Sequence, residues 1–206
     1  MKKLTLFLAI LFVSVLCSAC INNIAIQELN NKAQEFMQKG DIQGAISRLE
    51  SSVDLDGTIF ETRYNLGVAY ISAQEFKKAQ TQLEEAIKIK PEFADSYYSL
   101  AVAKESDALK ILEEDENDQT NTEPQTAETQ DDETDGLKNI SEEEAKYLVD
   151  TLNSSTELYK KYLELKPQSN DKEEVEAQIN YLEETISKYS QKYKLGQYQE
   201  QTQDIE

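Results

Sequence analysis

The chain has 206 residues, a formal net charge of −19, and neither tryptophan nor histidine. Glycine and proline are few, and the prevalence of alanine, glutamate, glutamine, lysine and leucine favours helices over sheets. The acidic balance argues against nucleic acid and against an anionic membrane surface as electrostatic partners, because both would repel the chain. The length predicts a single domain.

The N-terminal stretch has the layout of a secretion signal. Lys2 and Lys3 precede an apolar run over Leu4–Leu16, and two small residues follow that run. The run is shorter than the roughly 20 residues that span a bilayer as a helix. We therefore expect residues 1–19 to be a signal peptide that is removed on export.

The motif LCSAC at residues 16–20 resembles the lipobox of bacterial lipoproteins, in which the last cysteine carries the lipid and becomes the new N-terminus. The resemblance implies lipidation of Cys20 and a short lipid-anchored N-terminus over residues 20–25. Cys17 stands where the lipobox usually has an aliphatic residue, which leaves an ordinary cleaved signal and an uncleaved anchor as alternatives. Because Ile21 follows the cysteine, the resemblance places the protein at the bacterial cell membrane, on the periplasmic side of the outer membrane where two membranes exist.

A pattern of similar residues recurs every 34 positions over residues 26–59, 60–93 and from 94 onward. Small residues recur at two positions, and large apolar residues recur beside them. The matched sets are Ala33, Gly67 and Ala101; Leu66 and Leu100; Phe36 and Tyr70; Ile42 and Phe76; Ala45 and Ala79; Leu49 and Leu83. Together with Pro91 at the end of the central unit, this pattern resembles the tetratricopeptide repeat, which is a pair of helices that buries its apolar face by stacking on its neighbours.

The first two units carry signals for where their helices begin and end. Gly40 and Asp41 predict the turn of the first unit, which is the weaker match because Lys32 replaces the leucine of the other units. Thr58 followed by Glu61 predicts a capping box at the start of the central unit.

The third unit, residues 94–167, is interrupted. Its second helix matches the central unit at an offset of 76 instead of 34, so 42 residues are inserted. Helical spacing continues on both sides of the insertion, and Ser141 with Glu144 predicts a second capping box, so both helices should be extended. The segment at about 113–140 is rich in acids through Asp135 and poor in large apolar residues, which predicts disorder.

Residues 168–195 predict a last helix that covers the end of the repeats, with Asp171 as its cap and Gly196 as its stop. Its apolar stripe also resembles a short coiled-coil seam, so self-association of two copies is the alternative. The apolar stripe of this helix consists of Val175, Ile179, Leu182, Ile186, Tyr189 and Tyr193. Residues 196–206 follow the helix as a tail.

A partner-binding groove is expected along the first helices. In tetratricopeptide proteins the first helix of each unit lines the inner surface of a curved array, so residues one turn apart, and 34 apart between units, should share that surface. No Lys or Arg falls in the set, so an acidic peptide end is not the expected ligand; the alternative is that Tyr64 and Tyr98 pack against the next unit. The predicted groove residues are Asn30, Gln34, Met37, Tyr64, Val68, Ile71, Tyr98, Val102 and Glu105.

No catalytic, cofactor-binding or metal site is expected. Histidine is absent, a mature chain that is lipidated at Cys20 has no free thiol, and the hydroxyl residues have no recognisable activating partner. Asp115 and Asn117 are spaced as calcium ligands, but Thr120 stands where the loop needs glycine and Thr126 replaces its closing glutamate.

The sequence is thus interpreted as an all-α, tetratricopeptide-like helical-hairpin solenoid of about three repeats, with a capping C-terminal helix and a disordered acidic insertion. The resemblance implies a non-catalytic adaptor that is anchored to the membrane through a lipid and binds a peptide or amphipathic helix of a partner protein. The alternative is a structural envelope lipoprotein that self-associates through its C-terminal helix and has no dedicated ligand.

Overall fold

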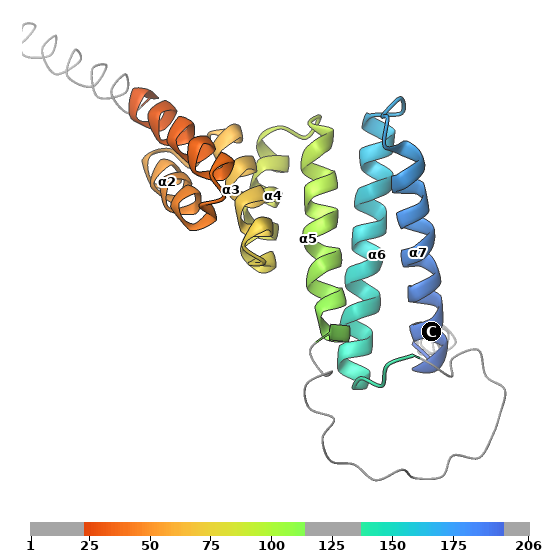
Figure 1. Cartoon of the computed structure of the whole chain (residues 1–206). Helices are drawn as coiled ribbons and strands as arrows, with labels where there is room; N and C mark the ends of the chain where they lie inside the picture. Colours follow the sequence, from red (N-terminus) through yellow and green to blue (C-terminus); the bar gives the residue numbers. More distant parts are fainter. Residues whose placement is uncertain (1–22, 114–136, 196–206) are drawn as a thin grey trace, which may run out of the picture. The chain divides into compact units, whose positions relative to one another are not determined.

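The computed structural model describes residues 23–113 and 137–195, and these residues contain helices and no strands. The all-α prediction is confirmed for this part of the chain. The predictions for the signal peptide, Cys20, the tail and residues 114–136 of the acidic insertion lie outside it. At the two ends of the segment predicted to be disordered over about 113–140 the prediction is wrong, because Glu113 ends a helix and residues 137–140 are held by hydrogen bonds such as those from Lys138 to the Ile111 and Leu112 carbonyls. The helices are residues 23–38, α2 (Ile42–Leu55), α3 (Phe60–Ser72), α4 (Phe76–Ile89), α5 (Ala94–Glu113), α6 (Glu142–Leu165) and α7 (Lys172–Lys192) (Figure 1).

The chain divides after Pro91 into two compact units, whereas length alone predicts one domain. We call them unit 1, which ends at Pro91, and unit 2, which begins at Glu92. Within each unit, helices that follow one another in sequence pack together, α2 on α3 and α3 on α4, and α5 on α6 and α6 on α7. Packing between sequence neighbours is what the repeat pattern predicts, because each hairpin buries its face on the next element.

Close approach of helices in unit 1 depends on small residues at the repeated positions. A Cβ added to Gly67 of α3 would lie 2.5 Å from Cγ of Leu83 on α4, too close for any side chain there. Ala33, Ala45 and Ala79 are at most 1% exposed. The small residues of the 34-residue pattern therefore form the helix contacts, as predicted.

Left-handed residues end three of the helices. Gly40, Gln74 and Lys194 have φ values of 75°, 59° and 52°. In each case the residue's own N–H and the next N–H bond back to carbonyls of the last helical turn, as for Gln74 to Ile71 and Glu75 to Tyr70. The turn at Gly40 is confirmed. The stop at Gly196 is wrong, because α7 ends at Lys192 and the left-handed residue that follows it is Lys194.

The predicted helix caps have mixed outcomes. The Ser141–Glu144 capping box is confirmed, with both of its reciprocal bonds present. The capping box at Thr58 is wrong, because α3 starts at Phe60 and Thr58 instead donates its N–H and hydroxyl to the Asp56 carboxylate at 2.8 and 2.6 Å.

Asp171 stands at the N-cap of α7, but its side chain makes no bond to the helix N–H groups. Its carboxylate instead accepts from the Tyr162 hydroxyl at 2.9 Å, and also from Ser169. These bonds lower the pKa of Asp171, the one from Ser169 most. Asp171 therefore ties the start of α7 to α6 and does not cap its own helix.

Unit 2 is a three-helix layer in which α6 lies between α5 and α7 (Figure 1). The extension of the third repeat is confirmed by the lengths of α5 and α6, 20 and 24 residues. Val175, Ile179, Leu182 and Tyr189 of α7 are buried in the core of this unit, and Ile186 and Tyr193 pack against that core. The α7 stripe thus covers the third repeat, and these side chains are not available as a seam for a second copy.

Among residues 23–113 and 137–195, no helix combines the length and the apolar character that crossing a membrane requires.

Candidate peptide-binding groove

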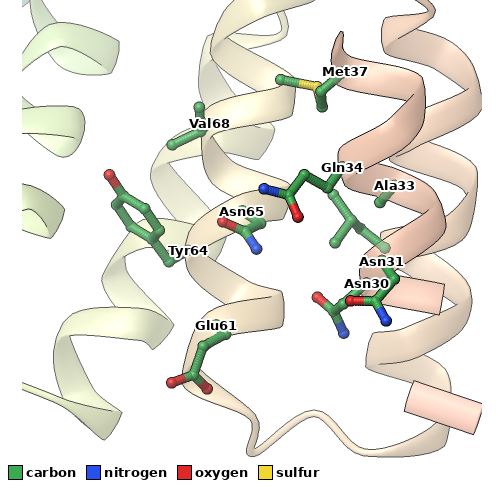
Figure 2. Close-up of a pocket in the computed structure, with 10 residues that line it drawn as sticks. Asn30, Asn31, Ala33, Gln34, Met37, Glu61, Tyr64, Asn65 and Val68 are labelled. Atoms are coloured by element: carbon green, nitrogen blue, oxygen red, sulfur yellow. The ribbon is translucent and has the colours of Figure 1, made fainter. Parts of the chain in front are cut away.

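A groove of about 380 Å³ lies in unit 1 between the first helix and α3. We call it groove 1. Gln34 and Met37 reach from the first helix toward Asn65 and Val68 of α3 (Figure 2). Its lining residues are Asn30, Asn31, Ala33, Gln34, Met37, Leu49, Glu61, Tyr64, Asn65 and Val68.

Helix periodicity places these side chains. The α3 residues that line the groove are spaced three, one and three positions apart in sequence, so they share one face of that helix. Asn30, Gln34 and Met37 likewise share one face of the first helix. Behind them, Ala33 and Leu49 are each 1% exposed and form the closed floor. Core packing therefore fixes the two helices while leaving the groove side chains at the surface.

The lining is rich in carboxamides. Asn30, Asn31, Gln34 and Asn65 contribute four, Glu61 is the single acid, and none of the ten lining residues is basic. A carboxamide both donates and accepts hydrogen bonds, which matches the alternating N–H and C=O groups of a peptide backbone. With Met37, Tyr64 and Val68 beside them, the amides offer backbone recognition together with apolar contacts.

Asn30 has a structural role at the base of groove 1. Its Nδ2 lies 2.9–3.0 Å from the Ile26 carbonyl, the Ser52 hydroxyl and the Thr62 hydroxyl, and its two N–H groups are shared among these acceptors, which ties the first helix to α2 and α3. Its Oδ1 is buried without a hydrogen-bond partner in the described part of the chain. An unpaired acceptor at this depth costs free energy, so Asn30 acts through its Nδ2 contacts and supports the groove from below.

Groove 1 brings together five of the nine predicted partner-binding residues, Asn30, Gln34, Met37, Tyr64 and Val68. Ile71, one turn further along α3, is half-buried and lines neither this groove nor the one in unit 2 described below. Tyr64 is also half-buried and stacks on Phe60, with ring centroids 6.0 Å apart.

Groove 1 is also lined by Asn31, Glu61 and Asn65, which were not predicted from the sequence. The signal that could have found them is their position next to predicted residues, or one turn away from them, on the same helices. Counting positions 34 apart selects a single line along each helix, whereas a groove takes side chains from both flanks of that line.

The other three predicted residues, Tyr98, Val102 and Glu105, line a second groove of about 210 Å³ within unit 2. We call it groove 2. α5 supplies these residues and Ser106, α6 supplies Tyr159, and α7 supplies the rest. Its lining residues are Tyr98, Val102, Glu105, Ser106, Tyr159, Glu174, Val175 and Gln178.

Glu105 is the ionisable centre of groove 2. The Tyr159 hydroxyl donates to its Oε2 at 2.7 Å, and Gln178 Nε2 donates to its Oε1 at 2.5 Å. Burial raises the pKa of the Glu105 carboxyl, while the bonds from Tyr159 and Gln178 act in the opposite direction. Burial and the adjacent carboxylate raise the pKa of Tyr159, which therefore keeps its proton and remains a donor.

Comparison with known proteins identifies the repeat. Residues 36–105 match the sequence model of a tetratricopeptide repeat family. No curated protein sequence matches the chain. The resemblance stated from the 34-residue pattern is thus confirmed.

Solved structures show the same fold. The first tetratricopeptide domain of human RPAP3 matches with a TM-score of 0.53 and 14% identity over 79% of this chain and 94% of that one. The first such domain of Spaghetti (RPAP3), bound to the HSP90 peptide SRMEEVD, matches with a TM-score of 0.53 and 14% identity, over 79% of this chain and 93% of that one. The Arabidopsis OM64 tetratricopeptide domain matches with a TM-score of 0.53 and 13% identity, over 77% of this chain and 96% of that one.

Proposed function

We propose that this chain, a tetratricopeptide repeat protein, is a non-catalytic scaffold that holds a peptide segment of a partner protein in groove 1. The observation that carries the proposal is the lining of that groove, where three exposed carboxamides stand beside Met37, Tyr64 and Val68 over a closed core. Such a surface pairs with a backbone while accepting aliphatic or aromatic side chains. A helical repeat supplies it with little rearrangement, because the two helices are fixed by packing.

The ligand of groove 1 is a segment without excess negative charge. A related fold, the first domain of Spaghetti (RPAP3), is bound to the HSP90 peptide SRMEEVD, which contains two glutamates, an aspartate and one arginine. Groove 1 offers no lysine or arginine among its lining residues and places Glu61 at one side. An acidic peptide would therefore meet repulsion with no compensating ion pair.

Selection from a display library of random peptides tests this function. The full chain should enrich neutral sequences with aliphatic or aromatic residues, and the double variant Gln34→Ala with Asn65→Ala should lose that enrichment while its helix content is unchanged. The control pair Gln43→Ala with Thr81→Ala changes exposed residues outside groove 1 and should bind as the unaltered chain does. Enrichment of acidic peptides, or equal binding by the groove variant, would contradict the proposal.

The scaffold is proposed to act at the bacterial cell envelope, attached through a lipid on Cys20. The LCSAC motif after an apolar run supports this location. Diacyl anchoring holds a protein at a bilayer without basic residues, in keeping with the acidic chain. Labelling of cells with a clickable fatty acid should mark the unaltered chain and Cys17→Ser but not Cys20→Ser, whereas label on Cys20→Ser would overturn the assignment.

A further inference from the structure

Groove 2 contains an anion that is fixed in place and has no cation among its lining residues. Both oxygens of Glu105 accept hydrogen bonds, from Tyr159 and from Gln178, which is the arrangement of an ionised carboxylate. Both donors are neutral, so they orient the carboxylate without cancelling its charge. Glu174 lies in the same lining and adds a second negative charge at an exposed position.

Aromatic rings form another side of groove 2. The Tyr98 ring meets Tyr159 at 5.6 Å between centroids in an edge arrangement, and it lies 5.2 Å from Tyr162. These contacts hold the ring in one orientation, while 36% of Tyr98 stays exposed. Ring faces attract cations, and a desolvated carboxylate beside them strengthens the attraction because water screens it less.

We propose that groove 2 binds the cationic side chain of a lysine or arginine from a partner protein, with Glu105 as its counter-ion and Tyr98 as its aromatic wall. The alkyl stem of such a side chain would lie along Val102 and Val175, which also line the groove. This site shares no residue with groove 1, so it stands whether or not groove 1 binds a peptide.

The choice of a basic side chain follows from the size and charge of groove 2. About 210 Å³ accommodates one long side chain rather than a folded segment. An anionic ligand is excluded by Glu105 and Glu174, and a neutral ligand would leave the charge of Glu105 without a counter-ion. A cation both pairs with Glu105 and reduces the desolvation cost that its burial imposes.

The test is an NMR titration of the full chain in detergent micelles with acetyl-Gly-Arg-Gly-amide and acetyl-Gly-Lys-Gly-amide. The neutral acetyl-Gly-norleucine-Gly-amide has the same kind of stem without the charge. With at least one cationic probe, we expect chemical-shift changes that saturate at the Gln178 side-chain amide and at the backbone amides of residues 98–106. The neutral probe should give no such changes. The difference between the arginine and lysine probes identifies which cation is preferred.

Two variants of equal charge change assign the effect to Glu105. Glu105→Gln keeps the shape of the side chain and should weaken binding of the cationic probe about tenfold or more. Glu143→Gln removes the same charge at an exposed position outside groove 2 and should leave binding unchanged. The proposal is overturned if neither cationic probe gives saturable shifts, if the neutral probe matches them, or if Glu105→Gln binds as well as Glu143→Gln.

Discussion

Gly67 shows how one residue sets the distance between two helices. Replacing it with alanine would place a Cβ 2.5 Å from Cγ of Leu83, in a core where Leu83 is fully buried and cannot move aside. Overpacking of this kind costs about 1–3 kcal/mol. Gly67→Ala should therefore lower the free energy of unfolding of unit 1 by that amount, as measured by urea denaturation followed by circular dichroism.

Gly57 provides the matched control for this prediction. A Cβ at Gly57 would lie 2.6 Å from a terminal nitrogen of Arg63, whose guanidinium also donates to the Gly57 carbonyl and to Gln82. Displacing that partly buried side chain costs less than overpacking a closed core, so Gly57→Ala should lower the free energy of unfolding by about 1 kcal/mol at most. Equal effects at the two glycines would show that α3 and α4 do not approach as closely as described.

Gln74 occupies a backbone conformation that suits glycine. Its φ of 59° places it in the left-handed region, where a side chain costs about 1 kcal/mol. Gln74→Gly should stabilise unit 1 by about 0.5–1 kcal/mol, seen as a higher denaturation midpoint. Gln74→Ala keeps a Cβ at the same position and should give no such gain, so stabilisation by alanine equal to that by glycine would contradict the account.

Ionisation of Glu105 should lower the stability of unit 2 as pH rises. Because burial raises the pKa of Glu105 in the folded chain, its protonated form favours folding, and that contribution is lost as pH rises through the folded pKa. Glu105→Gln, which cannot ionise, should raise the melting temperature relative to the unaltered chain more at pH 7 than at pH 4. Glu143→Gln should show no such pH-dependent gain, and a gain at Glu105 that is largest at pH 4 would refute the argument.

At the scale of elements, α7 covers the third repeat. Leu182 is fully buried in the core of unit 2, so Leu182→Ala should lower the free energy of unfolding by about 2–5 kcal/mol while the molar mass in solution stays the same. Tyr181, 52% exposed on the same helix, is the control, and Tyr181→Ala should have little effect on stability. A change of mass in Leu182→Ala with its stability intact would instead favour self-association through this helix.

The sequence predicts the helices better than their ends. Apolar spacing identifies α5, α6 and α7 because burial of one face depends directly on the period. Helix ends depend on which of several nearby bonds a side chain makes, and spacing does not decide between them. Thr58 bonds to Asp56, and Asp171 bonds to Tyr162 and Ser169, so neither caps a helix. The Ser141 side chain instead accepts from the Glu144 N–H and caps α6.

The same limit applies to the grooves. A 34-residue period finds Gln34 and Val68 because equivalent residues lie on equivalent faces of their helices. The same period predicts Glu105 as a groove residue but not its hydrogen bonds to Tyr159 and Gln178, which lie 54 and 73 residues further along the chain. These separations in sequence depend on the 42-residue insertion and on the packing of α7 against α6. The residue spacing within one repeat carries no information about either.

At the scale of the whole molecule, the chain combines two compact helical units, each with its own groove of distinct chemistry. Groove 1 is rich in carboxamides and lacks basic residues, while groove 2 is anionic and aromatic. The division after Pro91 was not predicted from length, because stacked repeats make few contacts beyond their neighbours and can separate into units without a linker. We therefore propose that unit 1 recognises a peptide backbone and unit 2 a basic side chain.

The most direct test of the central claim is photo-crosslinking in intact cells from a reactive residue placed at Gln34. The same residue at Lys88, exposed on α4 and outside groove 1, serves as the control. We expect the probe at Gln34 to capture a foreign protein that the probe at Lys88 does not, and the capture to be lost when Asn65→Ala is added. Self-crosslinks alone from Gln34, or the same products from both positions, would contradict a peptide-binding groove between the first helix and α3.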